Sequence, residues 1–188
     1  VDAETTPVNE IYNAYEKLLN AKVGYLITAD AGGEANWAVV NRKAMGEAEK
    51  SKFTISCISP RISSYTRTNN DSEQTDYVLM DADSLRSKST YANFVDSYCR
   101  VIDTDNNKSR IIPTSFIIAG LNARVDAEYG LQFSPAGTRR GIIPADIEIL
   151  QLATNTQMDR LYTQGINSFR STKAGVALWG DRTFYALR

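Results

Sequence analysis

The chain has 188 residues, of which 43% are hydrophobic and 23% charged, a composition typical of a folded globular protein rather than a disordered or fibrous one. Its 21 Lys and Arg residues nearly balance its 22 Asp and Glu residues, so a basic face for binding nucleic acid is not expected. It has no histidine and only two cysteines, Cys57 and Cys99, which excludes Ser-His and Cys-His catalytic arrangements and leaves too few ligands for a zinc site.

The first third of the chain predicts an α/β arrangement. Apolar residues at helical spacing predict an amphipathic helix from Pro7 to about Asn20, and residues 23–28 and 52–59 are typical of strands. The segment 35–50 between these strands has helical character. A strand, helix, strand unit joins parallel strands through a right-handed crossover, so we expect an α/β fold with a mixed sheet flanked by helices.

The next segment carries weaker signals. Residues 61–76 are polar and lack a period, which predicts an exposed, mobile loop within a single domain spanning residues 1–188. A short apolar piece at 77–80 then precedes Asp83 or Ser84, either of which can cap a helix. We therefore expect a helix over residues 85–95.

A β-hairpin is predicted where residues 98–102 and 109–112 flank the polar run 103–108. That run begins like a calcium-binding loop, with oxygen-bearing side chains at the first, third and fifth positions. Its sixth position is Lys108 instead of glycine, and its twelfth is Thr114 instead of glutamate. A polar turn is therefore favoured over a calcium site.

The most helical segment begins after Pro113 and ends at Gly130, with a stripe of Ile117, Leu121 and Val125 along one side. Gly120 is expected to allow another element to pack closely against this helix. A strand at 147–152, a helix at 157–164 and strands at 166–170 and 175–179 complete the predicted elements.

Two loops lie where anion sites are often built. Residues 30–34 join a strand to a helix but match neither G-x-G-x-x-G nor a phosphate loop, and Glu34 occupies the helix N-terminus that a phosphate would use. A plain turn is favoured, and an α/β nucleotide-binding enzyme stays as the weaker alternative. Residues 137–141 also lack a defining pattern, so we expect Arg139 and Arg140 to be solvated or to face another subunit.

The stretch Trp-Gly-Asp-Arg-Thr at residues 179–183 places an acid beside a base at a glycine that follows a strand, where α/β enzymes often carry catalytic groups. The sequence provides no nucleophile with a base and no metal cluster to accompany them, so a structural corner is favoured. Arg182 is expected to bind a carboxylate, with Asp126 or Asp181 as the candidate partner. Trp179 is expected to be buried.

Several motifs occur in a familiar order. Residues 112–126 contain a proline, then Ala-Gly, then Ala-Arg-x-Asp; residues 165–167 are Gly-Ile-Asn; and residues 179–183 fit Trp-Gly-x-Arg-Thr. In this order, from about residue 87 to the end, the chain resembles the central domain of contractile tail sheath proteins of bacteriophages. The residues that carry the resemblance are taken as structural motif residues: Gly120, Arg124, Asp126, Gly165, Asn167, Trp179, Gly180, Arg182 and Thr183.

The resemblance implies a structural subunit of a contractile phage tail sheath. Such subunits polymerise into a helical tube around an inner tail tube and contract to drive that tube through the host envelope. The implied partners are other sheath subunits, the inner tail tube protein and the baseplate, with no nucleic acid and no membrane insertion. No catalytic residue, cofactor or metal is implied.

The same resemblance implies a location in the virion, as the tail sheath, after assembly in the host cytoplasm. It also implies that the chain is a fragment of a longer one, in line with an amino terminus that lacks a starting Met. A sheath subunit of a bacterial contractile injection system is the alternative.

Overall fold

The computed structural model of the protein describes residues 6–20, 23–28, 33–66, 70–85, 87–103 and 108–185. Its elements are, in chain order, α1 (Thr6–Asn20), β1 (Tyr25–Ile27), α2 (Gly33–Ser51), β2 (Ile55–Ile58), α3 (Ile62–Thr66), α4 (Asp71–Ser84), β3 (Ala92–Val95), β4 (Tyr98–Asp103), β5 (Lys108–Pro113), α5 (Ser115–Tyr129), α6 (Gly137–Arg140), β6 (Ile147–Ile149), α7 (Asn155–Thr163), β7 (Ile166–Thr172) and β8 (Gly175–Trp179).

A five-stranded mixed sheet in the order β1-β2-β3-β7-β8 forms the centre of the molecule. The first four strands are parallel, and β8 pairs antiparallel with β7. The β1-α2-β2 unit is the predicted parallel crossover, and the α/β fold class with a mixed sheet flanked by helices is confirmed. Parallel strands need helices on both faces, which sets the layers described next.

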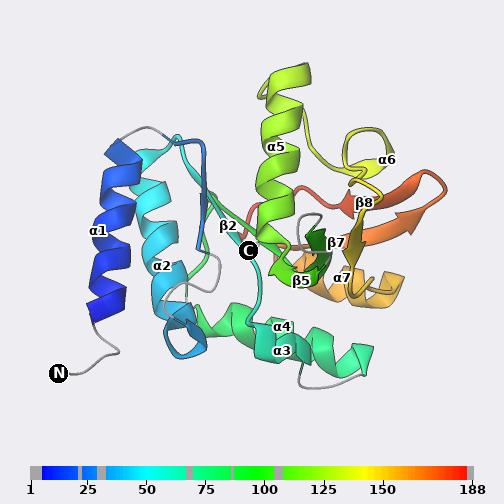
Figure 1. Cartoon of the computed structure of the whole chain (residues 1–188), viewed down its shortest axis with the longest axis horizontal. Helices are drawn as coiled ribbons and strands as arrows, with labels where there is room; N and C mark the ends of the chain where they lie inside the picture. Colours follow the sequence, from blue (N-terminus) through cyan, green and yellow to red (C-terminus); the bar gives the residue numbers. More distant parts are fainter. Residues whose placement is uncertain are drawn as a thin grey trace.

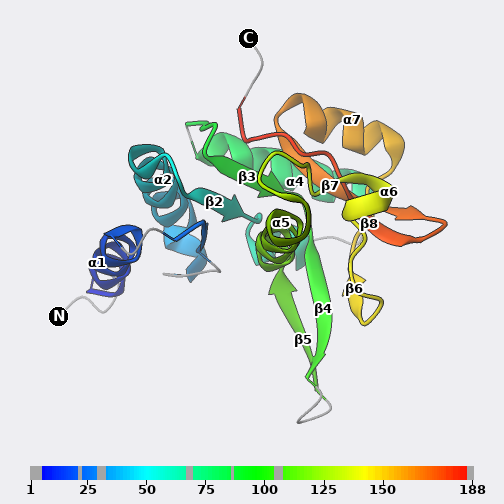
Figure 2. The ribbon, with the colours of Figure 1, turned by 90° about the horizontal axis from the view of Figure 1, so that it is seen from above.

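The sheet is covered on both sides (Figures 1 and 2). On one face, α2, α4 and α7 bury a cluster around Trp37, Phe94 and Leu161. On the other face, α5 packs on Cys57 and Val95 of the sheet. Helix α1 lies outside α2, to which it is joined through a smaller cluster. The central strand β3 and most of β2 are therefore buried on both faces.

A second sheet of three antiparallel strands, in the order β5-β4-β6, packs against α5. Strands β4 and β5 form the predicted hairpin, with Cys99 opposite Ile112 and Val101 opposite Arg110. The hairpin projects from the body of the molecule (Figure 2). The tip of its predicted turn, residues 104–107, lies outside the described residues.

The loop predicted over residues 61–76 is wrong for the part that the structure describes. Helix α3 and the start of α4 occupy it, and residues 67–69 lie outside the described residues. The helical period escaped detection because polar residues fill buried positions: Ser64, Gln74, Thr75 and Asp81 are buried. Asp81 accepts hydrogen bonds from the Arg61 N–H (2.8 Å) and the Ser64 hydroxyl (2.7 Å). These bonds satisfy its buried carboxylate, which the pattern of polar and apolar residues would place in solvent.

The helix predicted over residues 85–95 is also wrong. Asp83 and Ser84 are the last residues of α4 instead of the cap of a following helix, and Ala92–Val95 form the central strand β3. All four β3 residues are buried, so the strand shows none of the alternation that identifies a half-exposed strand. Its partners, β2 and β7, come from distant parts of the sequence.

The predicted end of the long helix is confirmed. Helix α5 ends at Gly130, whose φ of 101° lies in the left-handed region that favours glycine. Cys57 and Cys99 are free and buried, and burial raises the pKa of their thiols to about 12 and about 11. Among the described residues, no helix is long and apolar enough to cross a membrane.

Candidate functional site

The corner that follows β8 is held against the turn that begins β7 by two glycines. Gly165 and Gly180 have φ angles of 77° and 102°, which L side chains rarely adopt. A Cβ on Gly165 would lie 3.0 Å from the Thr183 carbonyl oxygen, and one on Gly180 would lie 2.7 Å from Oδ1 of Asn167. The Gly-Ile-Asn and Trp-Gly-x-Arg-Thr motifs therefore meet in space, and each leaves room for the other.

Asn167 of β7 clamps the backbone of the corner. Its Oδ1 accepts from the Arg182 N–H (3.0 Å), and its Nδ2 donates to the Arg182 carbonyl (2.7 Å) and to Oδ1 of Asn93 (2.6 Å). The residue is fully buried. One side-chain amide thus hydrogen-bonds both the N–H and the carbonyl of Arg182, as the backbone of a paired strand would.

Arg182 uses its side chain differently from the prediction. Its guanidinium lies 3.7 Å from the centre of the Tyr162 ring and donates to the Tyr162 carbonyl (3.1 Å). Neither carboxylate proposed as its partner fills that role among the described residues: Asp126 accepts from the Tyr25 hydroxyl, and Asp181 is exposed. The stack on an aromatic face and the hydrogen bond to the end of α7 fix Arg182 instead.

The chain then crosses the start of β3. The Phe184 N–H donates to the Ala92 carbonyl (2.7 Å), and the Phe184 carbonyl accepts from the Ser89 N–H (2.8 Å). The Phe184 ring is fully buried edge-on against Phe94, with ring centres 5.2 Å apart. The residue after Thr183 therefore completes the core on the α2 and α4 side of the sheet.

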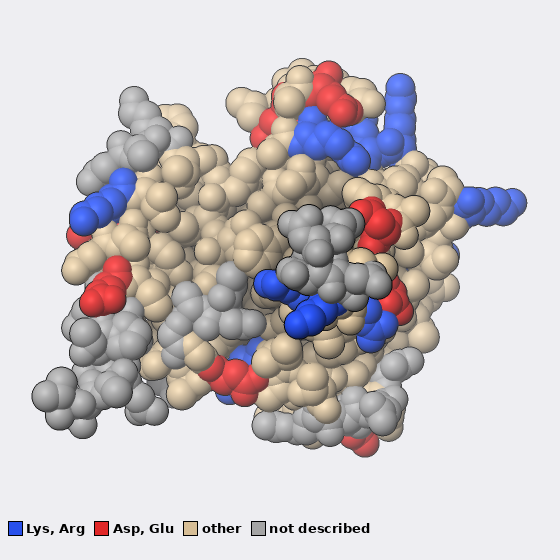
Figure 3. Space-filling model, in the orientation of Figure 1, with Lys and Arg blue, Asp and Glu red and all other residues tan. Residues whose placement is uncertain are grey.

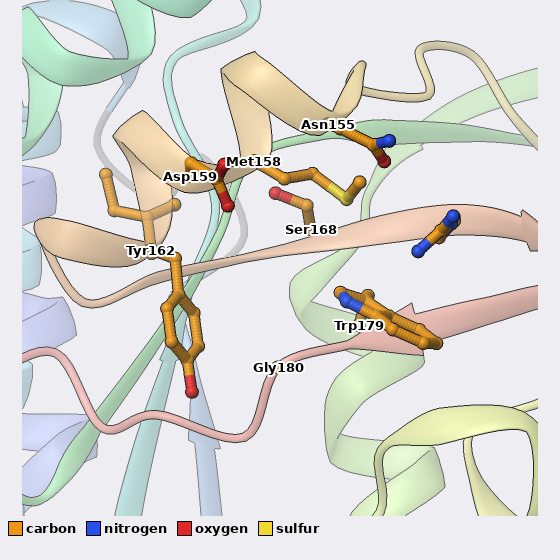
Figure 4. Close-up of a pocket in the computed structure, with 9 residues that line it drawn as sticks. Asn155, Met158, Asp159, Tyr162, Ser168, Trp179 and Gly180 are labelled. Carbon is orange, nitrogen blue, oxygen red and sulfur yellow. The ribbon is translucent and has the colours of Figure 1, made fainter.

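Trp179 is 40% exposed, so the prediction that it is buried is wrong. The Arg170 guanidinium lies 4.9 Å from the centre of its ring. The tryptophan forms one wall of a surface hollow of about 490 Å³ between α7 and the β7-β8 hairpin (Figure 4). The hollow is lined by Asn155, Met158, Asp159, Tyr162, Ile166, Ser168, Arg170, Trp179 and Gly180.

The groups at this hollow do not assemble into a catalytic set. Asp159 and Arg170 carry its opposite charges, while Ser168 is 2% exposed, so its hydroxyl does not reach solvent as a nucleophile must. Burial raises the pKa of the neighbouring Asp96 to about 7. Among the described residues, no three acidic or thiol side chains are placed to hold a metal ion.

Two of the three motif residues of α5 form attachments away from the corner. Arg124 donates to the carbonyls of Arg140 (2.6 Å) and Ile142 (3.2 Å), which ties the 137–142 segment to α5. Asp126 accepts from Tyr25 and so ties α5 to β1; burial and this hydrogen bond raise the pKa of the tyrosine. Gly120 is exposed, and no other described element comes within 4 Å of the place where its Cβ would be, so the expected close packing does not occur within the described part of the chain.

The two loops considered as anion sites have different surroundings. Residues 29–32 of the first lie outside the described residues, and Glu34 accepts from the Ser63 N–H (2.5 Å) at the first turn of α2. In the second, Arg140 donates to the Ser134 carbonyl (2.7 Å), and Arg139 is exposed. Glu34 therefore fixes α3, and the expectation that Arg139 and Arg140 are solvated or face another subunit stays a prediction.

Sequence reasoning missed Asn93 and Tyr162, which complete the corner. Asn93 lies in the strand that was mistaken for a helix, and nothing local marks an asparagine whose partner is 74 residues away. Tyr162 had a usable signal, because it precedes Gly165 by one turn at the end of the predicted helix. An aromatic ring at that place offers a face on which an arginine can stack.

Comparisons with known proteins agree with this architecture. The chain is 38% identical over 99 residues to the tail sheath protein of Enterobacteria phage T4, an alignment that covers 50% of the chain and 15% of that protein. It is 34% identical over 90 residues to the tail sheath protein of Burkholderia phage BcepMu, covering 46% of the chain and 19% of that protein. The aligned part is thus less than a fifth of each relative.

Solved structures show the same fold. The contracted helical sheath of the anti-feeding prophage (AFP) superimposes with a TM-score of 0.67 and 21% identity, covering 100% of the chain and 46% of the sheath chain. The contracted sheath complex of the extracellular contractile injection system PVC gives a TM-score of 0.57 and 17% identity, covering 88% of the chain and 41% of that one. The family described as the phage tail sheath protein central domain matches residues 8–184. The chain therefore belongs to the family of phage tail sheath protein central domains.

Proposed function

We propose that the protein is a structural subunit of a contractile phage tail sheath. It polymerises with its own copies into a helical tube around an inner tail tube, and the tube contracts to drive the inner tube through the host envelope. The observation that carries this proposal is the family match over residues 8–184, which spans the corner, the α5 attachments and both sheets.

The geometry supports a mechanical role. Asn167, Arg182 and Phe184 lock the end of the described chain onto the sheet, and Arg124 and Asp126 lock α5 to its two neighbours. A subunit that changes neighbours during contraction must keep its own fold while its interfaces exchange, because the work comes from two packings of the same rigid unit. These internal attachments suit such a unit, and no enzymatic activity belongs to the proposal.

The finer assignments follow from the same family membership. The partners are other sheath subunits, the inner tail tube protein and the baseplate, and the protein resides in the virion after assembly in the host cytoplasm. A sheath subunit of a bacterial contractile injection system is the second candidate, favoured by the likeness to the AFP and PVC sheaths. The identities of 34–38% to phage proteins over about half the chain favour the phage assignment.

Electron microscopy of the whole gene product tests the proposal. Purified protein is expected to form hollow, striated tubes of regular diameter. Protein that stays dispersed under every assembly condition, and that is stabilised by nucleotides or phosphates in a thermal-shift screen, would support the enzyme alternative instead. The neighbouring genes separate the two sheath candidates, since only a phage also encodes a capsid.

A further inference from the structure

A basic hollow lies beside the C-terminal half of α5. Arg124, Arg139 and Arg140 line a space of about 410 Å³ that contains one acid, Glu128. Arg124 and Arg140 donate to backbone carbonyls, and Arg139 forms no ion pair with any described residue. Figure 3 shows basic side chains at the top of the molecule, near the upper end of α5, with acidic side chains beside them. The hollow thus keeps a net positive charge that the described part of the chain leaves unneutralised.

The rim of this hollow also offers aromatic surface. Tyr129 and Phe133 are 43% and 40% exposed, with ring centres 6.2 Å apart. The Arg140 guanidinium lies 5.9 Å from the first ring and 5.2 Å from the second, which holds its charge in a fixed place. A matching surface would carry carboxylates together with a flexible apolar side chain.

The solvent face of α4 has this composition. Residues 70–85 contain five acids and no lysine or arginine, and one of the five, Asp81, is buried. Glu73, Asp76, Met80 and Asp83 are all exposed, and their spacing places them on one face of the helix, with Met80 63% exposed at its centre. Asp76 pairs with Arg160 (2.5 Å), whereas Asp83 forms no ion pair with the described residues. The face therefore carries three exposed acids with an apolar side chain in the middle, and Arg160 of α7 lies beside two of these acids.

The two surfaces cannot meet within one molecule. In Figure 1, α4 lies along the bottom, and the upper end of α5, with α6 beside it, lies at the top. Two different, complementary surfaces on separate parts of one chain join copies head to tail, and a contact of this kind propagates as a ring or an open helix.

We propose that the acidic face of α4 on one copy docks into the basic hollow of a second copy. Asp83 and Glu73 then face Arg139 and Arg140, and Met80 lies against the Tyr129 and Phe133 rings. The proposal rests on the proposed function, because a sheath is built from many copies of one chain. Exposed ion pairs contribute little stability each, so this contact sets the register of neighbouring copies and can be exchanged during contraction.

Charge reversal tests the contact in this chain. Sedimentation velocity, from micromolar to millimolar protein at low salt, measures the self-association of the wild type, of Arg139→Glu and of Asp83→Lys. Both substitutions change side chains that form no ion pair with described residues, so folding should be retained; circular dichroism checks this. Lys173→Glu and Asp181→Lys, also exposed, are the matched controls of equal charge change.

Each of the two single variants is expected to weaken association by about tenfold or more, because like charges then face each other. An equimolar mixture of Arg139→Glu and Asp83→Lys should restore association, because the unchanged α4 face of the first variant meets the unchanged hollow of the second, and the new acid of the first meets the new base of the second. The controls should match the wild type. Raising the salt from about 0.01 M to about 1 M should dissociate the wild type as the screening length falls from about 30 Å to about 3 Å. A monomeric wild type at millimolar concentration, or a mixture that fails to recover, overturns the proposal.

The outcomes for the contact and for the sheath function can be distinguished. If the whole gene product forms striated tubes and neither single variant changes them, the proposed contact is wrong while the sheath function stands. If the charge-reversal variants and their mixture behave as expected in solution but no tubes form under any condition, the contact stands and the sheath function fails.

Discussion

Replacing Asn167 by Ala removes the clamp on which the corner depends. The side chain is fully buried and makes three hydrogen bonds, two to the backbone of Arg182 and one to Asn93. Asn167→Ala leaves the Arg182 N–H, the Arg182 carbonyl and Oδ1 of Asn93 without these partners. Each of the three lost bonds contributes separately to the expected cost.

The magnitude follows from how buried each orphaned group is. An unsatisfied buried polar group costs about 1–3 kcal/mol, and Asn93 is 8% exposed, so its oxygen carries a cost in this range. Arg182 is only partly buried, and water can replace part of what its two backbone groups lose. The total is about 3 kcal/mol, which lowers the melting temperature by roughly 6–12 °C for a chain of this size.

Urea unfolding followed by circular dichroism measures this loss, with Asn122→Ala as the control. Asn122 is buried as well, at 8% exposed, lies in α5 and makes no side-chain hydrogen bond with the described residues, so its replacement should cost less than about 1 kcal/mol. Asn167→Asp should be at least as damaging as Asn167→Ala at neutral pH, because a carboxylate would face two oxygen acceptors, and it should recover on acidification. Equal stability of Asn167→Ala and Asn122→Ala would refute the clamp.

Three further substitutions test other parts of the structure. Burial raises the pKa of Asp96 from 3.8 to about 7, so the folded protein favours the neutral acid and loses stability as pH rises through this window. The stability of Asp96→Asn relative to wild type should therefore grow by about 1.4 kcal/mol per pH unit across it and stay constant outside it; urea unfolding at several pH values that showed a constant difference would argue against the buried acid. Trp179→Ala should cost only about 1–2 kcal/mol in the same assay, since the ring is 40% exposed, and a loss above about 3 kcal/mol would mean that the ring is buried. Gly120→Ala should raise stability by about 0.5–1 kcal/mol because space for a Cβ is open within a helix, and thermal unfolding that showed a loss would contradict the open site.

Much of the fold was predictable where the signal is local. The β1-α2-β2 unit, the β4-β5 hairpin and the end of α5 at Gly130 each follow from period, turn residues and a glycine within a few positions. The α4 and β3 predictions failed for the opposite reason. The buried face of α4 includes polar residues, and β3 is buried on both faces. Neither segment therefore shows the alternation of polar and apolar residues from which a helix or strand is predicted.

The candidate site, too, was predicted only in part: its motif residues were predicted, but their contacts were not. The motif residues Gly165, Asn167, Gly180 and Arg182 were recognised from the sequence, and the two glycines were expected at turns. Their mutual contacts were not: Arg182 was assigned a carboxylate partner, and its contacts are a tyrosine ring, a carbonyl and an asparagine amide. Arginine binds several kinds of acceptor with comparable energy, so the choice depends on which one the fold brings near.

By itself, the sequence determined the α/β class, the order of most elements and the family of this protein, because these depend on residue types and spacing along the chain. Only the tertiary structure decided that Asn167 serves as a strand-like partner for Arg182, that Trp179 faces solvent, and that the acidic α4 and the basic hollow beside α5 lie far apart. These outcomes depend on which distant segments the packed sheet brings together. Burial and hydrogen-bond partners are properties of that three-dimensional packing, which no short stretch of the chain encodes.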